Sequence, residues 1–300
     1  MINGIININK EKGYTSHDVV AKMRGILKIK KIGHTGTLDP DAEGVLPICI
    51  GKATKLVELI TDKDKTYEAV LKLGITTDTQ DITGKILSTR EVHVSEAEIR
   101  EAINSFIGEY MQLPPMYSAI KVNGKKLYEL AREGIEIERK RRKVRIDAIR
   151  ILQMNEKDHE ITLSVDCGKG TYIRTLLHDI GEKLACGGTM KSLTRTAVGS
   201  FKIENAYKLA EIEQIVQENR IDTVILPMDQ VLGTYPKITV TPKYHKLIYN
   251  GNSFRKEHTS HPAKEPELGW VRVYDSNHLF IGIYQYDIEK ECYKPVKMFL

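Results

Sequence analysis

The most informative segment of the 300-residue chain reads Gly33-His34-Thr35-Gly36-Thr37-Leu38-Asp39-Pro40-Asp41-Ala42-Glu43-Gly44-Val45-Leu46-Pro47. Its glycines and prolines predict a loop with short apolar pieces, which extends to Gly51. Asp39 precedes a proline, and an aspartate in such a loop is usually a turn former. Residue type alone therefore predicts a turn, and a chemical role for Asp39 needs support from the rest of the chain.

Strands and helices are mixed on both sides of this loop, without a regular strand–helix–strand rhythm. Apolar and alternating stretches predict strands at 5–8, 66–73 and 161–167. Apolar residues at helical spacing predict helices after the N-cap Ser16, after the Ser95–Glu98 capping box, after Gly170 and at 208–219. This order favours an α+β fold over a doubly wound parallel sheet.

The length of the chain allows one large domain or two. A cluster of turn residues at 226–236 follows the last predicted helix and indicates a boundary. We expect residues 1–230 to form one domain. Residues 236–300, which are rich in Val, Ile, Tyr and Thr, are expected to form a small all-β module.

Several protein classes are disfavoured by composition and spacing. Apolar runs fall short of the ~18–20 residues that a membrane helix needs, and the N-terminus has no signal-peptide pattern. Four scattered cysteines suit a reduced, cytoplasmic protein. Leu46 and Ala53 break the phosphate-loop pattern that residues 51–54 suggest. No nucleotide cofactor is therefore expected. His258 and His261 have no cysteine partners, so no metal is expected either.

The net charge of +5 is mild, but the basic residues are clustered. Residues 22–31 hold five basic residues and no acid, and residues 139–145 hold six basic residues in seven. Such clusters can bind a phosphate backbone. A solvated face is the competing interpretation, and the nearby acids Glu133, Glu136 and Glu138 favour it.

Six further segments accompany the central loop, and together they resemble the bacterial-type tRNA pseudouridine synthase B (tRNA pseudouridine-55 synthase) family. They are Lys10-x-x-Gly13-x-Thr15-Ser16, Gly51-x-Ala53-Thr54-Lys55, Lys65-x-Tyr67, Thr77-Asp78-Thr79-x-Asp81-x-x-Gly84, Pro114-Pro115-Met116-Tyr117-Ser118-Ala119-Ile120-Lys121-x-Asn123-Gly124 and Gly168-x-Gly170-Thr171-Tyr172-Ile173-Arg174-x-Leu176. The resemblance covers residues 3 to about 230. Glu11 departs from the proline usual in the family, which we expect to alter a loop and not the chemistry.

The resemblance implies a pseudouridine-synthase fold, with a mixed, mostly antiparallel sheet flanked by helices and a small C-terminal PUA-like β-barrel module. It implies an isomerase that flips uridine 55 out of the TΨC loop of tRNA and converts it to pseudouridine. The C1′–N1 bond breaks, the base turns, and C5 joins C1′, so no redox cofactor is needed. The expected partner is the tRNA T-arm stem-loop, bound by a cytoplasmic monomer without an obligate protein partner.

The resemblance assigns the nucleophile to Asp39 and its cationic partner to Arg174. An ionised carboxylate can act as a nucleophile, and a nearby cation lowers its pKa. Arg174 is predicted in the first turn of its helix, where the helix dipole disfavours positive charge. Such a conflict is typical of a functional site, although a surface arginine would also fit the pattern. Attack at C1′, attack at C6 and a glycal route all stay open for Asp39.

Three apolar or aromatic positions match the base pocket of the family. Tyr67 would stack on the target base and could move a proton through its hydroxyl, which makes it both a binding and a catalytic candidate. Tyr172 and Leu193 would line the same pocket. Taken alone, each of the three would be interpreted as a core residue.

Three basic positions complete the expected site. His34 matches the histidine that contacts the RNA loop and helps to displace the nucleotide, a step that costs a few kcal/mol. Lys10 and Lys55 match lysines near the site and are expected either to contact phosphates or to order the acidic loop.

Two other functions compete with this hypothesis. A non-catalytic RNA-binding or RNA-folding protein on the same scaffold would be expected to lack the set Asp39, Arg174 and Tyr67. A glycoside hydrolase would use Asp39 with Asp41, but neighbours on one loop seldom give the opposed carboxylates, roughly 5–10 Å apart, that its mechanism requires.

Overall fold

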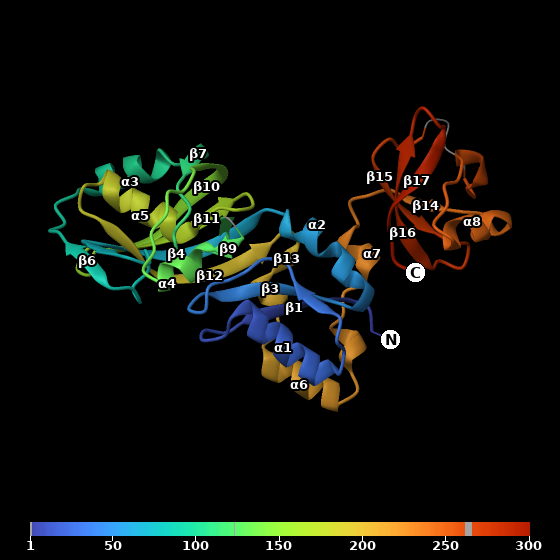
Figure 1. Cartoon of the computed structure of the whole chain (residues 1–300), viewed down its shortest axis with the longest axis horizontal. Coiled ribbons are helices and arrows are strands. Elements are labelled where there is room, and N and C mark those ends of the chain that lie inside the picture. The colour runs from blue at the N-terminus through green and yellow to red at the C-terminus, as the bar shows by residue number, and fades with distance from the viewer. Residues whose placement is uncertain (1, 123, 262–265) are drawn as a thin grey trace.

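One large sheet forms the centre of the protein in the computed structural model, which describes residues 2–122, 124–261 and 266–300 (Figure 1). Along the sheet the order is β1-β3-β12-β4-β11-β10-β7, with β2 on β3 and β13 on β12. Neighbouring strands are antiparallel except for the parallel pair β12–β3. The bounds are β1 (Gly4–Lys10), β2 (Ile32–His34), β3 (Glu43–Ile50), β4 (Lys65–Leu73), β7 (Gly108–Gln112), β10 (Arg142–Asn155), β11 (Glu160–Cys167), β12 (Gly188–Val198) and β13 (Phe201–Lys202). The predicted α+β fold with a mixed, mostly antiparallel sheet is confirmed.

The strand β3 occupies the second half of the segment that the sequence predicts as a loop. Seven of its eight residues are buried, so it gives a continuous apolar run instead of the alternation that marks a half-buried strand. Gly44 lets β3 approach β12: its φ is +105°, and a Cβ atom there would lie 2.2 Å from the carbonyl oxygen of Arg195. The loop that carries Asp39 is therefore short and is fixed by a central strand.

Helices cover two regions of this sheet, as Figure 1 shows. Helices α1 (Ser16–Leu27) and α6 (Leu209–Gln217) pack with β1, β2 and β3 around one apolar cluster, while α3 (Glu96–Asn104) and α5 (Ile173–Lys183) pack on β4, β11 and β10. The N-cap of α1 is Thr15 and not the predicted Ser16, because the Thr15 hydroxyl accepts the Asp18 N–H at 3.1 Å. Ser16 is the first helical residue, and its hydroxyl is available to the Asp39 loop.

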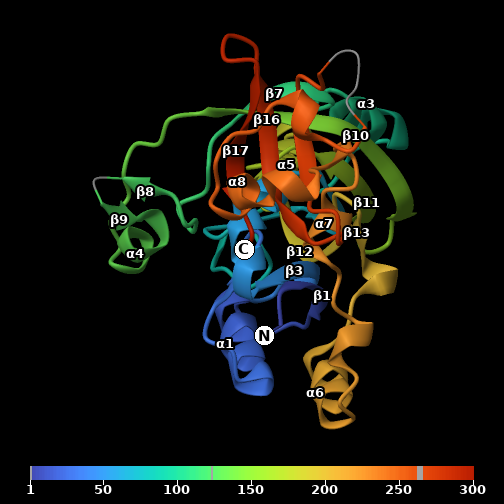
Figure 2. The ribbon, with the colours of Figure 1, turned by 90° about the vertical axis from the view of Figure 1, so that its right-hand side faces the viewer.

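Two small hairpins extend from the sheet. The first is β5 (Ile75–Thr77) with β6 (Ile86–Thr89), and the second is β8 (Lys121–Val122) with β9 (Lys125–Lys126), followed by α4 (Leu127–Arg132). Figure 2 shows the second hairpin and α4 standing away from the main sheet on two extended connections. Asn123, which belongs to one of the family segments, lies outside the described residues.

The C-terminal part has a sheet of its own, in the order β14 (Lys237–Thr239), β15 (Trp270–Tyr274), β16 (Phe280–Asp287) and β17 (Cys292–Met298). It is not all-β, since the five-residue helix α8 (His245–Tyr249) packs into its core. A second cluster joins Ile283 and Phe299 of this part to Leu56 and Ile60 near α2 (Val57–Thr61), with α7 (Met228–Val231) alongside. The division into residues 1–230 and 236–300 remains a prediction. In the described part of the chain, no helix combines the length and apolar character needed to cross a membrane.

Candidate active site

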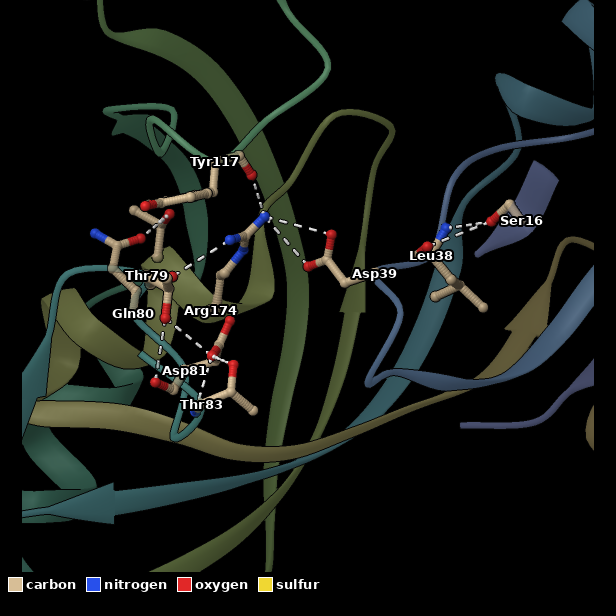
Figure 3. Close-up of polar contacts among 10 residues, drawn as sticks. Ser16, Leu38, Asp39, Thr79, Gln80, Asp81, Thr83, Tyr117 and Arg174 are labelled. Atoms are coloured by element: carbon tan, nitrogen blue, oxygen red, sulfur yellow. Dashed lines mark hydrogen bonds and ion pairs between the residues drawn. The ribbon is translucent and has the colours of Figure 1, made fainter. Parts of the chain in front are cut away.

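The loop between β2 and β3 presents Asp39 above the central strands, and a serine fixes its position. The Ser16 hydroxyl oxygen accepts the N–H of Leu38 at 2.9 Å and lies 3.3 Å from the Leu38 carbonyl oxygen (Figure 3). Leu38 itself is buried in the core beside β4 and β12. The residue before Asp39 is thus anchored by both its backbone and its side chain, and the Asp39 carboxylate points toward Arg174 (Figure 3).

Of the two lysines expected near this loop, one holds it and the other is engaged elsewhere. The buried amino group of Lys10 donates to the carbonyl oxygens of Pro40 at 3.1 Å and Ala42 at 2.6 Å. Burial lowers the pKa of Lys10 to about 8. Lys55 instead donates to the carbonyl oxygen of Met298 at 2.6 Å, in the C-terminal strand β17. Lys10 is thus the lysine that contacts the loop, and the expected role of Lys55, at phosphates or at the acidic loop, stays a prediction.

Asp39 and Arg174 form an ion pair across the site. The Arg174 Nη2 atom lies 3.2 Å from one carboxylate oxygen of Asp39 and 3.4 Å from the other. The arginine side chain is only 6% exposed, whereas that of Asp39 is 39% exposed, so solvent or a ligand can reach the carboxylate from one side. Arg174 lies in the first turn of α5, as predicted, and points off the helix toward the loop (Figure 3).

Two further backbone groups hold the guanidinium of Arg174 in place. It donates to the carbonyl oxygen of Thr79 at 3.3 Å and to that of Tyr117. The Thr79 turn is closed by Asp81, whose Oδ1 atom accepts from the Thr79 hydroxyl at 2.9 Å and from the Thr83 hydroxyl at 2.6 Å. Arg174 is therefore in position for the carboxylate before any ligand binds, so ligand binding needs to order its side chain very little.

Burial dominates the electrostatics of the candidate nucleophile. It raises the pKa of Asp39 above the ordinary value, while the positive charge of Arg174 opposes the rise. The negative charges of Asp81 and Asp41 add to the rise, and the positive charge of Lys10 opposes it. The carboxylate is thus partly desolvated on the side that faces Arg174 and open on the other.

Tyr67 and Leu193 lie on the adjacent strands β4 and β12 and belong to the same buried cluster as Leu38. Both residues are buried, and each is 8% exposed. Burial raises the pKa of Tyr67, against the effect of Arg195, so its hydroxyl is protonated at neutral pH. The structure thus places an aromatic ring and a leucine in the wall beneath the Asp39 loop.

Tyr172 is the N-cap residue of α5 and stands two residues before Arg174. The buried side chain of Gln112 binds its backbone twice: Gln112 Nε2 donates to the Tyr172 carbonyl oxygen at 2.9 Å, and the Tyr172 N–H donates to Gln112 Oε1 at 2.8 Å. This pair of bonds fixes the start of α5 to β7. Burial raises the pKa of the half-buried Tyr172 ring hydroxyl.

His34 ends β2, just before the loop, and its ring packs edge-on against His17 of α1 at a centroid distance of 5.2 Å. Burial lowers the pKa of His34, and the charge of His17 lowers it further. Burial and the charge of His17 thus both favour the neutral form of the imidazole.

Sequence reasoning did not single out several of the residues that build this site. The sequence assigns no site role to Ser16, Asp81, Gln112, Tyr117 or Arg195, although Asp81 and Tyr117 lie in the quoted segments. Burial of Gln112 and Arg195 becomes visible only in the fold. Across the described residues, no group of three or more His, Cys, Asp and Glu side chains could hold a metal ion.

Comparison with solved structures extends the fold assignment to the whole chain. The chain in the crystal structure of a Cbf5-Nop10-Gar1 complex aligns with a TM-score of 0.74 and 26% identity, covering 99% of this chain and 85% of that one. The chain in the archaeal box H/ACA sRNP Nop10-Cbf5 complex aligns with a TM-score of 0.71 and 25% identity, covering 99% and 86%. This likeness places the chain in the class of proteins with the pseudouridine-synthase fold.

Sequence comparison identifies the family within that class. Residues 24–173 match the model of the TruB family pseudouridylate synthase N-terminal domain, and residues 174–233 match the tRNA pseudouridylate synthase B C-terminal domain. Proteins named tRNA pseudouridine synthase B are 55% identical in Lachnoclostridium phytofermentans and 48% identical in Clostridium kluyveri, each over the full length of both chains. The chain belongs to the TruB family of pseudouridylate synthases.

Proposed function

We propose that this chain is the isomerase that converts uridine 55 in the TΨC loop of tRNA to pseudouridine. The observation that carries the proposal is the Asp39–Arg174 ion pair at 3.2 Å, which places a buried cation on a partly accessible carboxylate. Relatives named tRNA pseudouridine synthase B, aligned over the full chain, support tRNA as the substrate.

The carboxylate of Asp39 performs the chemical step. Breaking the C1′–N1 bond leaves its electron pair on the uracil and an electron-deficient C1′ on the ribose. An ionised carboxylate can bond to that C1′, or it can add to C6 of the neutral uracil before the bond breaks. Each of the three routes that the sequence leaves open therefore requires Asp39 in its charged form. Arg174 maintains that charge in a site from which bound RNA excludes water.

The neighbouring side chains are assigned to the flipped base and the RNA loop. Tyr67, Tyr172 and Leu193 form the wall of the base pocket, and the ring of Tyr67 stacks on the uracil. His34 contacts the RNA loop from the end of β2. Lys10 acts through the loop backbone that it binds, and not through a phosphate.

The competing functions are less well supported. A non-catalytic RNA-binding protein has no need for the assembled set Asp39, Arg174 and Tyr67. A glycoside hydrolase would need Asp41 to face Asp39, yet the Asp41 side chain is 52% exposed and lies 3.8 Å from Lys12.

The basic cluster 139–145 is proposed to bind the backbone of the T-arm, together with residues 22–31 on and after α1. Two basic residues of the first cluster currently pair with acids at exposed positions, as Lys143–Glu109 and Arg145–Asp64. Exposed ion pairs contribute little to stability, so RNA phosphates can replace these acids at small cost. The enzyme is proposed to act as a cytoplasmic monomer on the T-arm, with residues 236–300 as an RNA-binding module.

Incubation of the pure protein with a T-arm hairpin, followed by mapping of pseudouridine, tests the proposal. We expect modification at the position equivalent to uridine 55 and none in a hairpin with cytidine there. The matched control is Asp39→Asn, which keeps size and hydrogen bonding and should bind the hairpin with unchanged affinity but produce no pseudouridine. Pseudouridine formation by pure Asp39→Asn protein would refute the assignment of the nucleophile. Light scattering of the free protein checks the monomer.

A further inference from the structure

Arg195 is a buried arginine. It lies in β12, between β3 and β4, and is only 1% exposed. Its Nε atom donates to the carbonyl oxygen of Val45 at 2.7 Å, and its Nη2 atom donates to that of Gly36 at 3.2 Å. Both acceptors are uncharged. A buried charge held by neutral groups is expensive, so its retention calls for a function.

The two carbonyl groups flank the catalytic loop. Gly36 precedes Asp39 by three residues, and Val45 follows it in β3. The guanidinium thus connects the two ends of the loop from below, whereas Lys10 holds its middle through Pro40 and Ala42.

Arg195 also faces Tyr67. The two residues are direct partners in the antiparallel β12–β4 ladder, and opposite residues in such a ladder project from the same face of the sheet. This pairing places the Arg195 side chain next to that of Tyr67, and the charge of Arg195 lowers the pKa of Tyr67 against the effect of burial. One arginine therefore holds the nucleophile's loop and neighbours the tyrosine.

We propose that Arg195 is a positioning residue that couples the two halves of the active site, setting the height of the Asp39 loop and orienting the Tyr67 hydroxyl toward the bound base. The inference rests on the proposed isomerase function. Lysine at this position would keep the charge but not the fork of donors, and glutamine would keep N–H donors but not the charge.

A double-mutant cycle tests this coupling. Single-turnover rates with saturating enzyme are measured for Arg195→Lys and Arg195→Gln, each in the wild-type and in the Tyr67→Phe background. With Tyr67 present, we expect Arg195→Lys to lose about tenfold and Arg195→Gln about a hundredfold, the loss typical of a misplaced catalytic group. In the Tyr67→Phe background the difference between the two variants should disappear, because contacting residues are not additive.

Arg272→Lys is the matched control, since Arg272 also donates to backbone carbonyls, those of Tyr235 and Asp229, but lies in the C-terminal sheet. It should change the rate by the same factor in both backgrounds. Thermal unfolding is measured for each variant. Only an Arg195 variant that is folded is used to compare the rates in the two backgrounds. Equal losses for an Arg195 variant in the two backgrounds would mean a purely structural role and would overturn the inference. Failure of the wild-type protein to form pseudouridine would instead overturn the proposed function.

Discussion

The guanidinium of Arg174 lies 3.2 Å from the carboxylate of Asp39, although 135 residues separate them in the chain. The two come from different parts of the fold, the β2–β3 loop and the first turn of α5. Each is fixed by its own backbone contacts, Asp39 through Leu38 and Ser16, and Arg174 through Thr79 and Tyr117. The ion pair therefore does not need RNA in order to form.

Removing the positive charge of Arg174 should shift the acid limb of the curve of reaction rate against pH. Burial raises the pKa of Asp39, and Arg174 counteracts that rise, so the rate should fall as the pH drops through a pKa above the ordinary aspartate value of about 3.9. Arg174→Met removes the counteracting charge and should shift the acid limb to higher pH. Arg174→Lys keeps the charge and should shift it less. Single-turnover rates between pH 4.5 and 8 (about the range in which RNA and protein are both stable) measure the shift. An acid limb at the same pH in all three proteins would exclude Asp39 as the titrating group.

Lys10 should stabilise both the loop and the fold. Lys10→Met retains the buried stem but leaves the carbonyl oxygens of Pro40 and Ala42 without their donor. A buried polar group that loses its partner costs about 1–3 kcal/mol, so the free energy of unfolding should fall by that amount. The rate should fall as well, with RNA affinity unchanged. Chemical denaturation and single-turnover kinetics measure the two effects. Weaker RNA binding at an unchanged rate would instead indicate the phosphate contact.

Much of this structure follows from local signals in the sequence. The strand β4 alternates because only one of its faces is fully buried, and α3 begins at the predicted capping box of Ser95 and Glu98. The strand β3 could not be predicted in this way, since it is buried on both faces and contains Pro47.

The same limit applies to the site. The motif around Asp39 is continuous in sequence and carries its own resemblance, but the contacts of Gln112 with Tyr172 and of Arg195 with Gly36 join segments 60 and 159 residues apart. Such pairs meet only when the whole sheet and its loops are assembled, and strand register is a property of the whole sheet. The motif that contains Lys55 likewise does not reveal the contact of Lys55 with β17.

RNA affinity should depend steeply on salt. If residues 22–31 and 139–145 neutralise phosphates, each lost contact reduces the slope of log affinity against log salt by roughly 0.7–0.9. Lys140→Gln combined with Arg142→Gln should weaken binding and flatten the slope, while the single-turnover rate at saturating enzyme stays unchanged. The matched control is Lys157→Gln combined with Lys191→Gln, two exposed lysines of the large sheet region outside both clusters, of which Lys191 already pairs with Glu160. Binding that does not change with salt would contradict the prediction.

Tyr67→Phe separates the two roles of the tyrosine. The ring is buried in the wall beneath the Asp39 loop, and its hydroxyl faces the charge of Arg195. Stacking needs only the ring, so a purely stacking tyrosine would tolerate phenylalanine with little loss of rate. A hydroxyl that moves a proton contributes about 10²–10⁴-fold, and we expect the second case, with Tyr67→Phe at least roughly a hundredfold slower at normal RNA affinity.

Tyr67→Leu provides the comparison, because it removes the stacking surface as well as the hydroxyl. It should flip the base less readily and lose a further stacking contribution of about 1–3 kcal/mol. Single-turnover rates with saturating enzyme report the chemistry, and a fluorescent base analogue beside the target reports flipping. Normal flipping with a slow reaction in Tyr67→Phe, but impaired flipping in Tyr67→Leu, would assign the hydroxyl to proton transfer and the ring to the platform. A Tyr67→Phe enzyme that runs near the wild-type rate would leave the ring as the only contribution of Tyr67 and would contradict the proton-transfer role.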